Sequence, residues 1–239
     1  LTQAGKVYIY WGRNNQSNIL SEADLELQGV ADGGWFGYSI DSGDIDNDGV
    51  DDLAISQFPF WSDRGNAKVA IIKGSAALSE KKVIVTDDRY DNISIKAAPQ
   101  GLVLASKLHL EDFDNDGNLD ILLGAPGAEV DKSDQEGDFY LIKNNGLLKE
   151  NYYLDQGDFE TVIHGENRDD WFGDEFTTLD YNGDGYKDLA VAAIYADSEK
   201  GVDNGKVYLI PGNGAKIGKQ KELIENGNGV SRGAVVKRI

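Results

Sequence analysis

Three nine-residue segments hold most of the side chains in this chain that could do chemistry. Residues 44–52 read DIDNDGVDD, residues 112–120 read DFDNDGNLD and residues 180–188 read DYNGDGYKD, so the starts are 68 residues apart both times. Carboxylates at alternating positions can all point to one side of a tight loop, and the glycine at position 6 permits the sharp bend. This number of hard oxygen donors suits Ca2+ better than zinc or copper.

The predicted ligands are the side chains at positions 1, 3, 5 and 9 of each loop and the backbone carbonyl of position 7. We expect the final aspartate to bind bidentately. Because Asn182 makes the third loop less negative, we expect that loop to be the weakest site. The ligand set is Asp44, Asp46, Asp48, Val50 and Asp52; Asp112, Asp114, Asp116, Asn118 and Asp120; and Asp180, Asn182, Asp184, Tyr186 and Asp188.

The D-x-D-x-D-G start is compatible with two other interpretations of these loops. An EF-hand shares the D-x-D-x-D-G start, but it needs a glutamate at position 12 and helices on both sides. Position 12 is apolar in all three copies, as Ile55, Leu123 and Val191. Plain Asp/Asn/Gly turns between strands are the other interpretation. Three copies with clustered carboxylates would bring like charges together without benefit unless a cation binds, so we predict three Ca2+ sites.

The charge balance agrees with this prediction. The formal net charge is −19, and the loops contribute eleven candidate ligand carboxylates, so three bound Ca2+ ions would bring the net charge from −19 to −13. The negative electrostatic field of such a chain disfavours binding to nucleic acid and to anionic membrane surfaces. We therefore expect neither a nucleic-acid partner nor membrane insertion.

The rest of the composition narrows the class of protein. No stretch approaches 18 apolar residues, so no membrane span is predicted, and the first residues do not read as a signal peptide. The absence of methionine, even at position 1, indicates a processed or excised piece. The absence of cysteine excludes disulfides and thiolate metal sites.

Short apolar runs recur around the loops. Trp-Phe-Gly stands before the first and third loops, and an apolar triplet follows every loop. Runs rich in β-branched and aromatic residues and bounded by Gly and Asn are typical of strands. The recurring runs are 35–37 and 171–173; 53–55, 121–123 and 189–191; and the GKVY-type runs 5–10, 67–72, 137–142 and 205–210.

About four short strands in every 68 residues predict an all-β protein, a β-propeller built of four-stranded blades. A single blade cannot bury both of its faces, so neighbouring blades must stack on it. The equivalent positions of Trp35 and Trp171 fit such a contact between blades.

The order Phe-Gly, Asp-rich loop, D-L-A-[IV] or LLGAP, then G-K-V-Y resembles the FG-GAP repeat of integrin α-subunit β-propellers and their bacterial relatives. The segment 123–126 supplies Leu-Gly-Ala-Pro, and the resemblance covers nearly the whole chain. The second copy departs from Phe-Gly with Val-Leu-Ala at 103–105, and the first and third copies replace GAP at 56–58 and 192–194. Integrin propellers of this type close with seven blades, so the resemblance implies a partial propeller or a segment of a seven-bladed one.

In this scheme the chain divides into units. The expected units are 1–34, the third and fourth strands of a blade; 35–102, 103–170 and 171–226, three blades with one calcium loop each; and 227–239, the start of a further blade.

The resemblance also implies a function. In integrins the loop lies on the face opposite ligand recognition, so the Ca2+ is expected to be structural. Affinities of about 10⁻⁵ to 10⁻³ M would be filled by millimolar extracellular calcium, which favours the cell surface or exterior. We expect an adhesion or recognition module that binds a protein or glycan, the remainder of the propeller or another subunit. The alternatives are the propeller domain of a larger extracellular carbohydrate-active enzyme, or an architectural subunit of a cell-surface assembly.

Candidate partner-binding residues lie in the connections between second and third strands, which differ most among the copies. Phe60 and Trp61 could stack on a sugar or fill a pocket of a partner, and Tyr195 occupies a similar connection. Neither His109 nor His164 has a Ser or Cys nucleophile signature nearby, so we predict no catalytic residue and no enzymatic activity.

Overall fold

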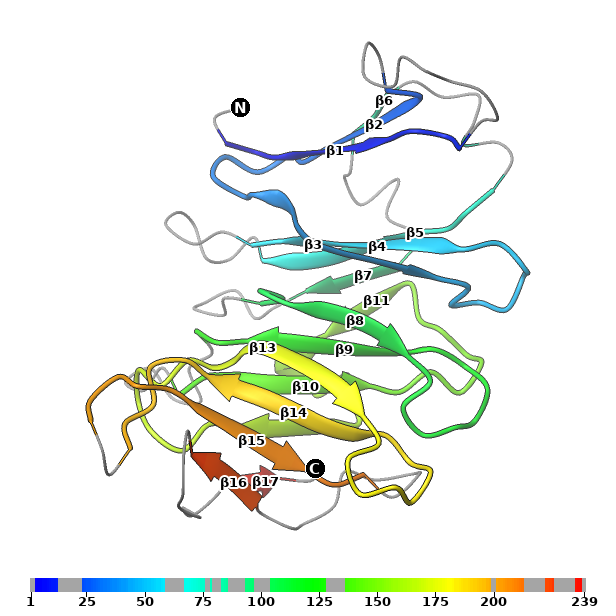
Figure 1. Ribbon diagram of the computed structural model, residues 1–239. Coiled ribbons are helices and arrows are strands. Elements are labelled where there is room, and N and C mark those ends of the chain that lie inside the picture. Colours follow the sequence, from blue (N-terminus) through cyan, green and yellow to red (C-terminus); the bar gives the residue numbers. More distant parts are fainter. Residues whose placement is uncertain are drawn as a thin grey trace.

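The computed structural model describes residues 3–12, 23–58, 67–75, 78, 83–85, 93–96, 104–127, 136–198, 201–212, 222–225 and 235–237. The described segments form β-strands in four sheets that follow one another along the molecule (Figure 1). A 3₁₀ turn, η3 (Leu154–Gln156), follows β11. Among the described residues, no helical segment has the length and apolar character needed to cross a bilayer.

The three later sheets share one plan, in which four strands pair antiparallel in chain order. The second sheet contains β3 (Phe36–Gly43), β4 (Asp52–Gln57), β5 (Lys68–Ile72) and β7 (Ile93–Lys96). The third contains β8 (Leu108–Glu111), β9 (Asp120–Ala125), β10 (Asp138–Ile142) and β12 (Thr161–His164). The fourth contains β13 (Phe172–Leu179), β14 (Asp188–Ala193), β15 (Lys206–Ile210) and β16 (Glu222–Glu225).

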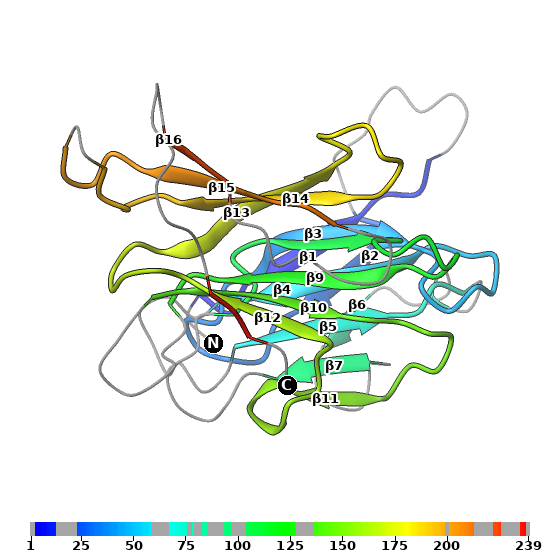
Figure 2. The same cartoon turned by 90° about the horizontal axis from the view of Figure 1, so that it is seen from below.

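The first sheet contains three strands, and both it and the second sheet include a strand that comes from the chain segment of the following sheet. β1 (Lys6–Ile9) pairs with β2 (Leu25–Gln28), and β6 (Val83–Val85) joins β2 in parallel. β11 (Asn151–Tyr153) joins β7 in parallel in the same way (Figure 2). In both cases a strand from the connection between the third and fourth strands of one sheet extends the preceding sheet.

The last strand, β17 (Val235–Lys237), pairs antiparallel with β12 as a fifth strand of the third sheet. It comes from the segment 227–239, which the sequence assigned to the start of a further blade. The division of the chain into units at the residue numbers given above stays a prediction.

The core is split into layers between the sheets, because successive residues of a strand point to opposite faces. In β10, Phe139 and Leu141 pack in the layer shared with the fourth sheet, whereas Tyr140 and Ile142 pack in the layer shared with the second. This burial on both faces explains why the strands read as continuous apolar runs rather than as an alternation of apolar and polar residues.

Phenylalanine, rather than tryptophan, fills the contact between sheets. Phe36 and Phe172 are 3% and 0% exposed, whereas the preceding Trp35 and Trp171 are half-buried. Trp35 and Trp171 have φ values of 47° and 56°, so the backbone turns at these residues before each first strand.

Candidate metal centres

The three Asp-rich loops occupy the same place in three successive sheets, between the first strand and the second. They lie along one side of the stack, at the right of Figure 1. The side-chain amide of Asn47 donates to Oδ1 of Asn118 at 2.8 Å, and that of Asn115 donates to the carbonyl of Gly185 at 3.3 Å. Each loop therefore contacts the next one.

The backbone of each loop bends twice through the left-handed region. Residues with a β-carbon rarely adopt such φ angles, and Gly and Asn do so most readily. Position 4 has φ values of 60°, 59° and 75° and position 6 has values of 87°, 90° and 87° in the three loops. The residues concerned are Asn47, Asn115 and Gly183, then Gly49, Gly117 and Gly185.

The first aspartate of each loop stabilises the bend by accepting backbone N–H bonds, two in loops one and two and three in loop three, where Gly183 also donates to Asp180 at 2.8 Å. In loop one, Asp44 accepts from Asp48 at 2.9 Å and from Gly49 at 2.8 Å. The same two bonds are 2.9 and 3.0 Å in loop two and 3.1 and 3.0 Å in loop three. The aspartate at position 5 accepts the N–H of position 7 at 2.8, 2.9 and 2.9 Å.

Loops one and two gather carboxylates closely enough to share a cation. Asp44, Asp46 and Asp48 each offer an oxygen, and these oxygens lie within 4.8 Å of one another. Asp112, Asp114 and Asp116 do the same in loop two. Two ligands on one Ca2+, each about 2.3–2.6 Å from the ion, are at most roughly 5 Å apart, so the donor type and spacing fit Ca2+.

Loop three differs at position 3. Its Asn182 donates a side-chain N–H to Oδ2 of Asp184 at 3.0 Å, where the other loops have a carboxylate. Among the described residues, loop three therefore forms no group of three clustered carboxylates.

The final aspartates are buried, and both of their oxygens accept backbone N–H bonds. They are 1%, 1% and 2% exposed. Each oxygen has two lone pairs, so one N–H bond leaves a direction open to a metal. Oδ2 of Asp188 also accepts the N–H of Asn182 at 3.3 Å, so in that residue Oδ1 keeps the open direction. The bonds to Oδ2 of Asp52, Asp120 and Asp188 come from Ile45 at 3.1 Å, Phe113 at 3.2 Å and Tyr181 at 2.9 Å; those to Oδ1 come from Gly74, Asn144 and Gly212, each at 2.8 Å.

Burial raises the pKa of two of these carboxyl groups. It raises the pKa of Asp120 to about 7, against the lowering effect of the Asn144 N–H bond. Burial also raises the pKa of Asp52 above its usual range. Without a cation, charge at these positions is therefore unfavourable.

A lysine points into each of the first two loops. Nζ of Lys73 lies 2.8 Å from Oδ2 of Asp46. Lys143 forms an ion pair with Asp114, and its Nζ lies 3.8 Å from Oδ2 of Asp116. These hydrogen bonds to carboxylate raise the pKa of both lysines. No motif in the sequence indicates these lysines, although both directly follow the third strand of their sheet.

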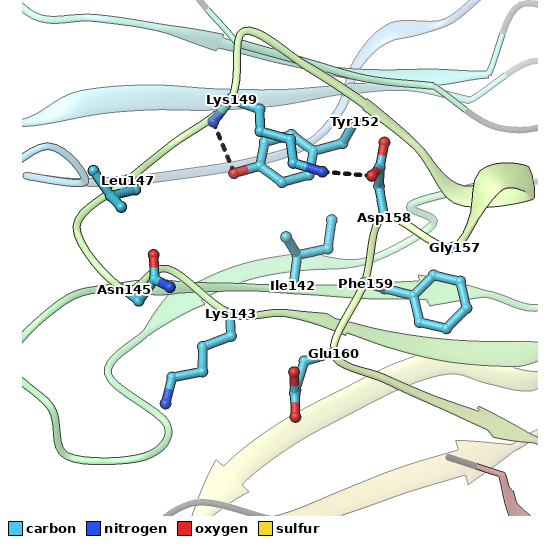
Figure 3. A pocket seen from close by; sticks show the side chains of 10 residues that line it. All are labelled: Ile142, Lys143, Asn145, Leu147, Lys149, Tyr152, Gly157, Asp158, Phe159 and Glu160. Carbon is cyan, nitrogen blue, oxygen red and sulfur yellow. Dashed lines mark hydrogen bonds and ion pairs between the residues drawn. The ribbon is translucent and has the colours of Figure 1, made fainter. Parts of the chain in front are cut away.

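Lys143 also lines a surface cavity of about 280 Å³ (Figure 3). The cavity is formed by residues 142–160, the segment that carries β11. The Lys149 side chain pairs with Asp158 on the opposite side from Lys143 in that view, and its backbone N–H donates to the Tyr152 hydroxyl at 3.1 Å.

The two histidines contact carboxylates within the sheets. Nδ1 of His109 on β8 lies 2.6 Å from Oδ2 of Asp41 on β3. This contact joins the first strands of two sheets. Nδ1 of His164 lies 2.7 Å from Oδ1 of the buried Asp138, whose Oδ2 accepts from the Tyr140 hydroxyl at 2.8 Å.

Of the three predicted partner-binding residues, Phe60 and Trp61 lie outside the described residues. Tyr195 is 45% exposed, and its ring packs edge-on against Trp171 at 5.2 Å. It follows β14, at the opposite end of that strand from the Asp-rich loop.

Comparison of the sequence with known proteins matches two segments of the chain to a family. The family model described as FG-GAP repeat matches residues 36–69 and 172–210, which run from the first to the third strand of the second and fourth sheets. Integrin alpha-4 of Xenopus laevis is 31% identical over 203 residues, covering 82% of this chain and 17% of that protein. Integrin alpha-PS2 of Drosophila melanogaster is 30% identical over 214 residues, covering 84% of this chain and 14% of that protein.

Part of the chain is also similar to an enzyme. Phosphatidylinositol-glycan-specific phospholipase D of Rattus norvegicus is 35% identical over 123 residues, covering 51% of this chain and 14% of that protein. The chain thus spans about a sixth of the length of these curated relatives, or less. With its stacked four-stranded sheets, the chain is an integrin α-like β-propeller segment that carries FG-GAP repeats.

Proposed function

We propose that this segment binds Ca2+ in its three loops and serves as an adhesion or recognition module outside the cell, with the metal in a structural role. The observation that carries the proposal is the pair of matching carboxylate groups in loops one and two, in the same place of successive sheets. The proposed ligands are those predicted from the sequence, including the carbonyls of Val50, Asn118 and Tyr186. Each four-stranded sheet is then one blade.

The metal would act by neutralising charge where two strands meet. Each loop joins the first and second strands of its sheet, so a bound ion would tie both strands to the ion and to each other. The buried Asp120 supports this role, because its raised pKa means that its charge is poorly compensated by the protein alone.

The relatives support the biological setting. Integrins are similar to this chain over more than four-fifths of its length, so we propose an extracellular or cell-surface location and a protein or glycan partner. The connection that carries Tyr195 lies at the opposite end of β14 from the metal loop and is the proposed recognition side. The rest of a propeller or another subunit is a further candidate partner.

A second candidate function is the propeller part of a larger extracellular enzyme. The match to a phospholipase D over half of the chain favours it. This candidate keeps the same metal loops but places the chemistry in another part of the protein. Activity of the purified segment alone towards a phospholipid or polysaccharide would contradict the non-enzymatic proposal.

Thermal unfolding with and without Ca2+ tests the metal proposal. With a dissociation constant of roughly 0.1 mM, 1 mM Ca2+ stabilises the folded state by about 1.4 kcal/mol per site. Three sites would raise the melting temperature by roughly 10 °C for a chain of this size. We expect Mg2+ to have a much smaller effect, because it demands octahedral geometry and loses water reluctantly. A melting temperature that does not change between chelator and Ca2+ would contradict the proposal.

A further inference from the structure

We propose that Lys73 and Lys143 are tethered counter-ions that compete with Ca2+ for loops one and two, so that loop three fills first. This rests on the proposed function, because it concerns how the same loops take up the metal. It reverses the order expected from the loop residues alone, in which Asn182 made the third loop the weakest.

The three loops can be compared because their surroundings are in register. Gly74, Asn144 and Gly212 each donate a backbone N–H, at 2.8 Å, to the final aspartate of their loop. The residue just before each donor therefore occupies an equivalent place at the end of the third strand. That residue is Lys73 in the first loop, Lys143 in the second and Pro211 in the third.

The two lysines contact carboxylates that a cation would need as ligands. Lys73 contacts Asp46, and Lys143 contacts both Asp114 and Asp116, which are members of the clustered carboxylate groups. Proline has no charge to place there. Among the described residues, no Lys or Arg forms an ion pair with Asp180, Asp184 or Asp188, and Lys187 of the same loop pairs instead with Glu111 at 3.3 Å.

Counting these ammonium groups removes the charge advantage of the first two loops. Four ligand carboxylates and one lysine give a formal charge of −3, which is also the charge of the three carboxylates of loop three. A divalent ion must in addition displace the ammonium or bear its repulsion at close range. A displaced Lys143 still has a carboxylate close by, because Glu160 lines the same cavity.

The consequence is a division of roles. The lysines stabilise the metal-free loops by compensating part of their charge, and they lower the affinity of those loops for the metal. Within the part of the chain that the structure describes, loop three has no such substitute, so it depends on the ion at lower calcium concentrations than the other two.

The test is calcium titration by calorimetry on the wild type and on Lys143→Gln and Lys73→Gln. We expect each substitution to tighten binding at its own loop by roughly tenfold, which corresponds to about 1.4 kcal/mol. Lys149→Gln is the matched control, because it removes the same charge from a lysine that lines the same cavity but pairs with Asp158. We expect it to leave calcium affinity unchanged.

Terbium luminescence identifies the order of filling. Tyr181 and Tyr186 are 59% and 42% exposed within loop three, and loops one and two contain no Tyr or Trp, so tyrosine-sensitised emission reports loop three. We expect this emission to saturate before calorimetry shows all sites filled. In Pro211→Lys, we expect the emission to saturate at a higher Tb3+ concentration. This variant tests the proposal by adding a lysine to loop three instead of removing one from another loop.

The possible results separate the two proposals. If Ca2+ binds but neither lysine substitution changes its affinity, or if loop three fills last, the counter-ion proposal is wrong and the metal sites stand. If neither Ca2+ nor Tb3+ binds to the wild type, both the proposed metal sites and the counter-ion proposal are wrong. A lysine with a merely structural role would lower the melting temperature equally in chelator and in Ca2+, whereas we expect Lys143→Gln to lower it in chelator only.

Discussion

The final aspartates of the loops show how a single residue can serve both the fold and a metal. Asp120 is buried, and its carboxylate accepts N–H bonds from its own loop and from the end of the third strand of its sheet. A protonated or a metal-bound carboxyl suits this position better than a bare charge does. The residue therefore couples stability to both pH and calcium.

In the metal-free protein we expect this residue to lower stability as pH rises. The pKa of Asp120 is about 7 in the folded state and about 3.9 in an unfolded chain, so the folded state binds more protons between these values. The free energy of unfolding therefore falls as pH rises through that window. We expect the stability of Asp120→Asn relative to wild type to increase by on the order of 2 kcal/mol from about pH 4 to pH 7.5 in chelator.

Urea unfolding of both proteins across this range is the measurement. The amide loses one backbone hydrogen bond, which adds an offset that does not depend on pH, so the slope is the quantity to compare. In saturating Ca2+ the order should reverse, because the metal favours the carboxylate. A difference between the two proteins that stays constant with pH would show that Asp120 does not titrate in this window.

Individual site residues could be predicted from the sequence where the candidate ligands lie close together in the chain. The D-x-D-x-D-G spacing predicted four side-chain ligands in each loop, and the first three carboxylates lie together in loops one and two, whereas Asp52 and Asp120 are not members of these groups. It could not predict Lys73 and Lys143, because they come from the end of the third strand of each sheet. They reach the loops only because β4 pairs with both β3 and β5, and β9 pairs with both β8 and β10.

At the scale of the strand, glycines set how closely neighbouring sheets approach. A β-carbon on Gly124 of β9 would lie 1.9 Å from the carbonyl oxygen of Gly173 on β13. Gly124 belongs to the Gly-Ala-Pro segment and Gly173 to the Phe-Gly segment of the next repeat. The two halves of the FG-GAP pattern therefore meet across adjacent sheets.

Gly124→Ala is expected to destabilise the protein by about 2 to 3 kcal/mol, because the new methyl group would force two backbones apart. Gly201→Ala is the control. Its β-carbon would meet only the side chain of Asn204 at 3.8 Å, and we expect a change below about 0.5 kcal/mol. Chemical denaturation of both variants in Ca2+ measures the difference. Equal stabilities would mean that the sheets are not packed at this distance.

The period of 68 residues predicted four strands per repeat, and four-stranded meanders are present. It did not predict β6 or β11, which extend neighbouring sheets, and it assigned the segment that holds β17 to the start of a further blade rather than to the third sheet. Strands of three residues carry too little pattern to be recognised, and their partners lie far away in the chain. The sequence also indicated Trp35 and Trp171 as contacts between blades, whereas the neighbouring Phe36 and Phe172 are the buried residues.

For the whole molecule, stacking is what buries the strands. Leu108 and Phe176 hold equivalent places in the first strands of the third and fourth sheets, and they are 1% and 6% exposed because the preceding sheet covers them. The equivalent Ile40 on β3 is 47% exposed. Burial of these positions thus depends on the neighbouring sheet rather than on the residue itself, as expected for a repeat protein.

A stack of this kind places its three loops in a row and concentrates negative charge along one side. The chain carries a formal net charge of −19, and repulsion of this size opposes a compact state. Bound calcium would relieve it where the carboxylates are densest. Three occupied loops would bind three metal ions per chain.

Equilibrium dialysis against buffered Ca2+, with the bound metal measured by atomic spectroscopy, gives this number of ions. We predict three Ca2+ per chain at saturation. We predict two when Asp184→Asn removes a ligand from loop three alone, with the melting temperature in chelator nearly unchanged. Fewer than three ions on the folded wild-type chain at saturating calcium, or a count unaffected by Asp184→Asn, would contradict the assignment of the three loops as calcium sites.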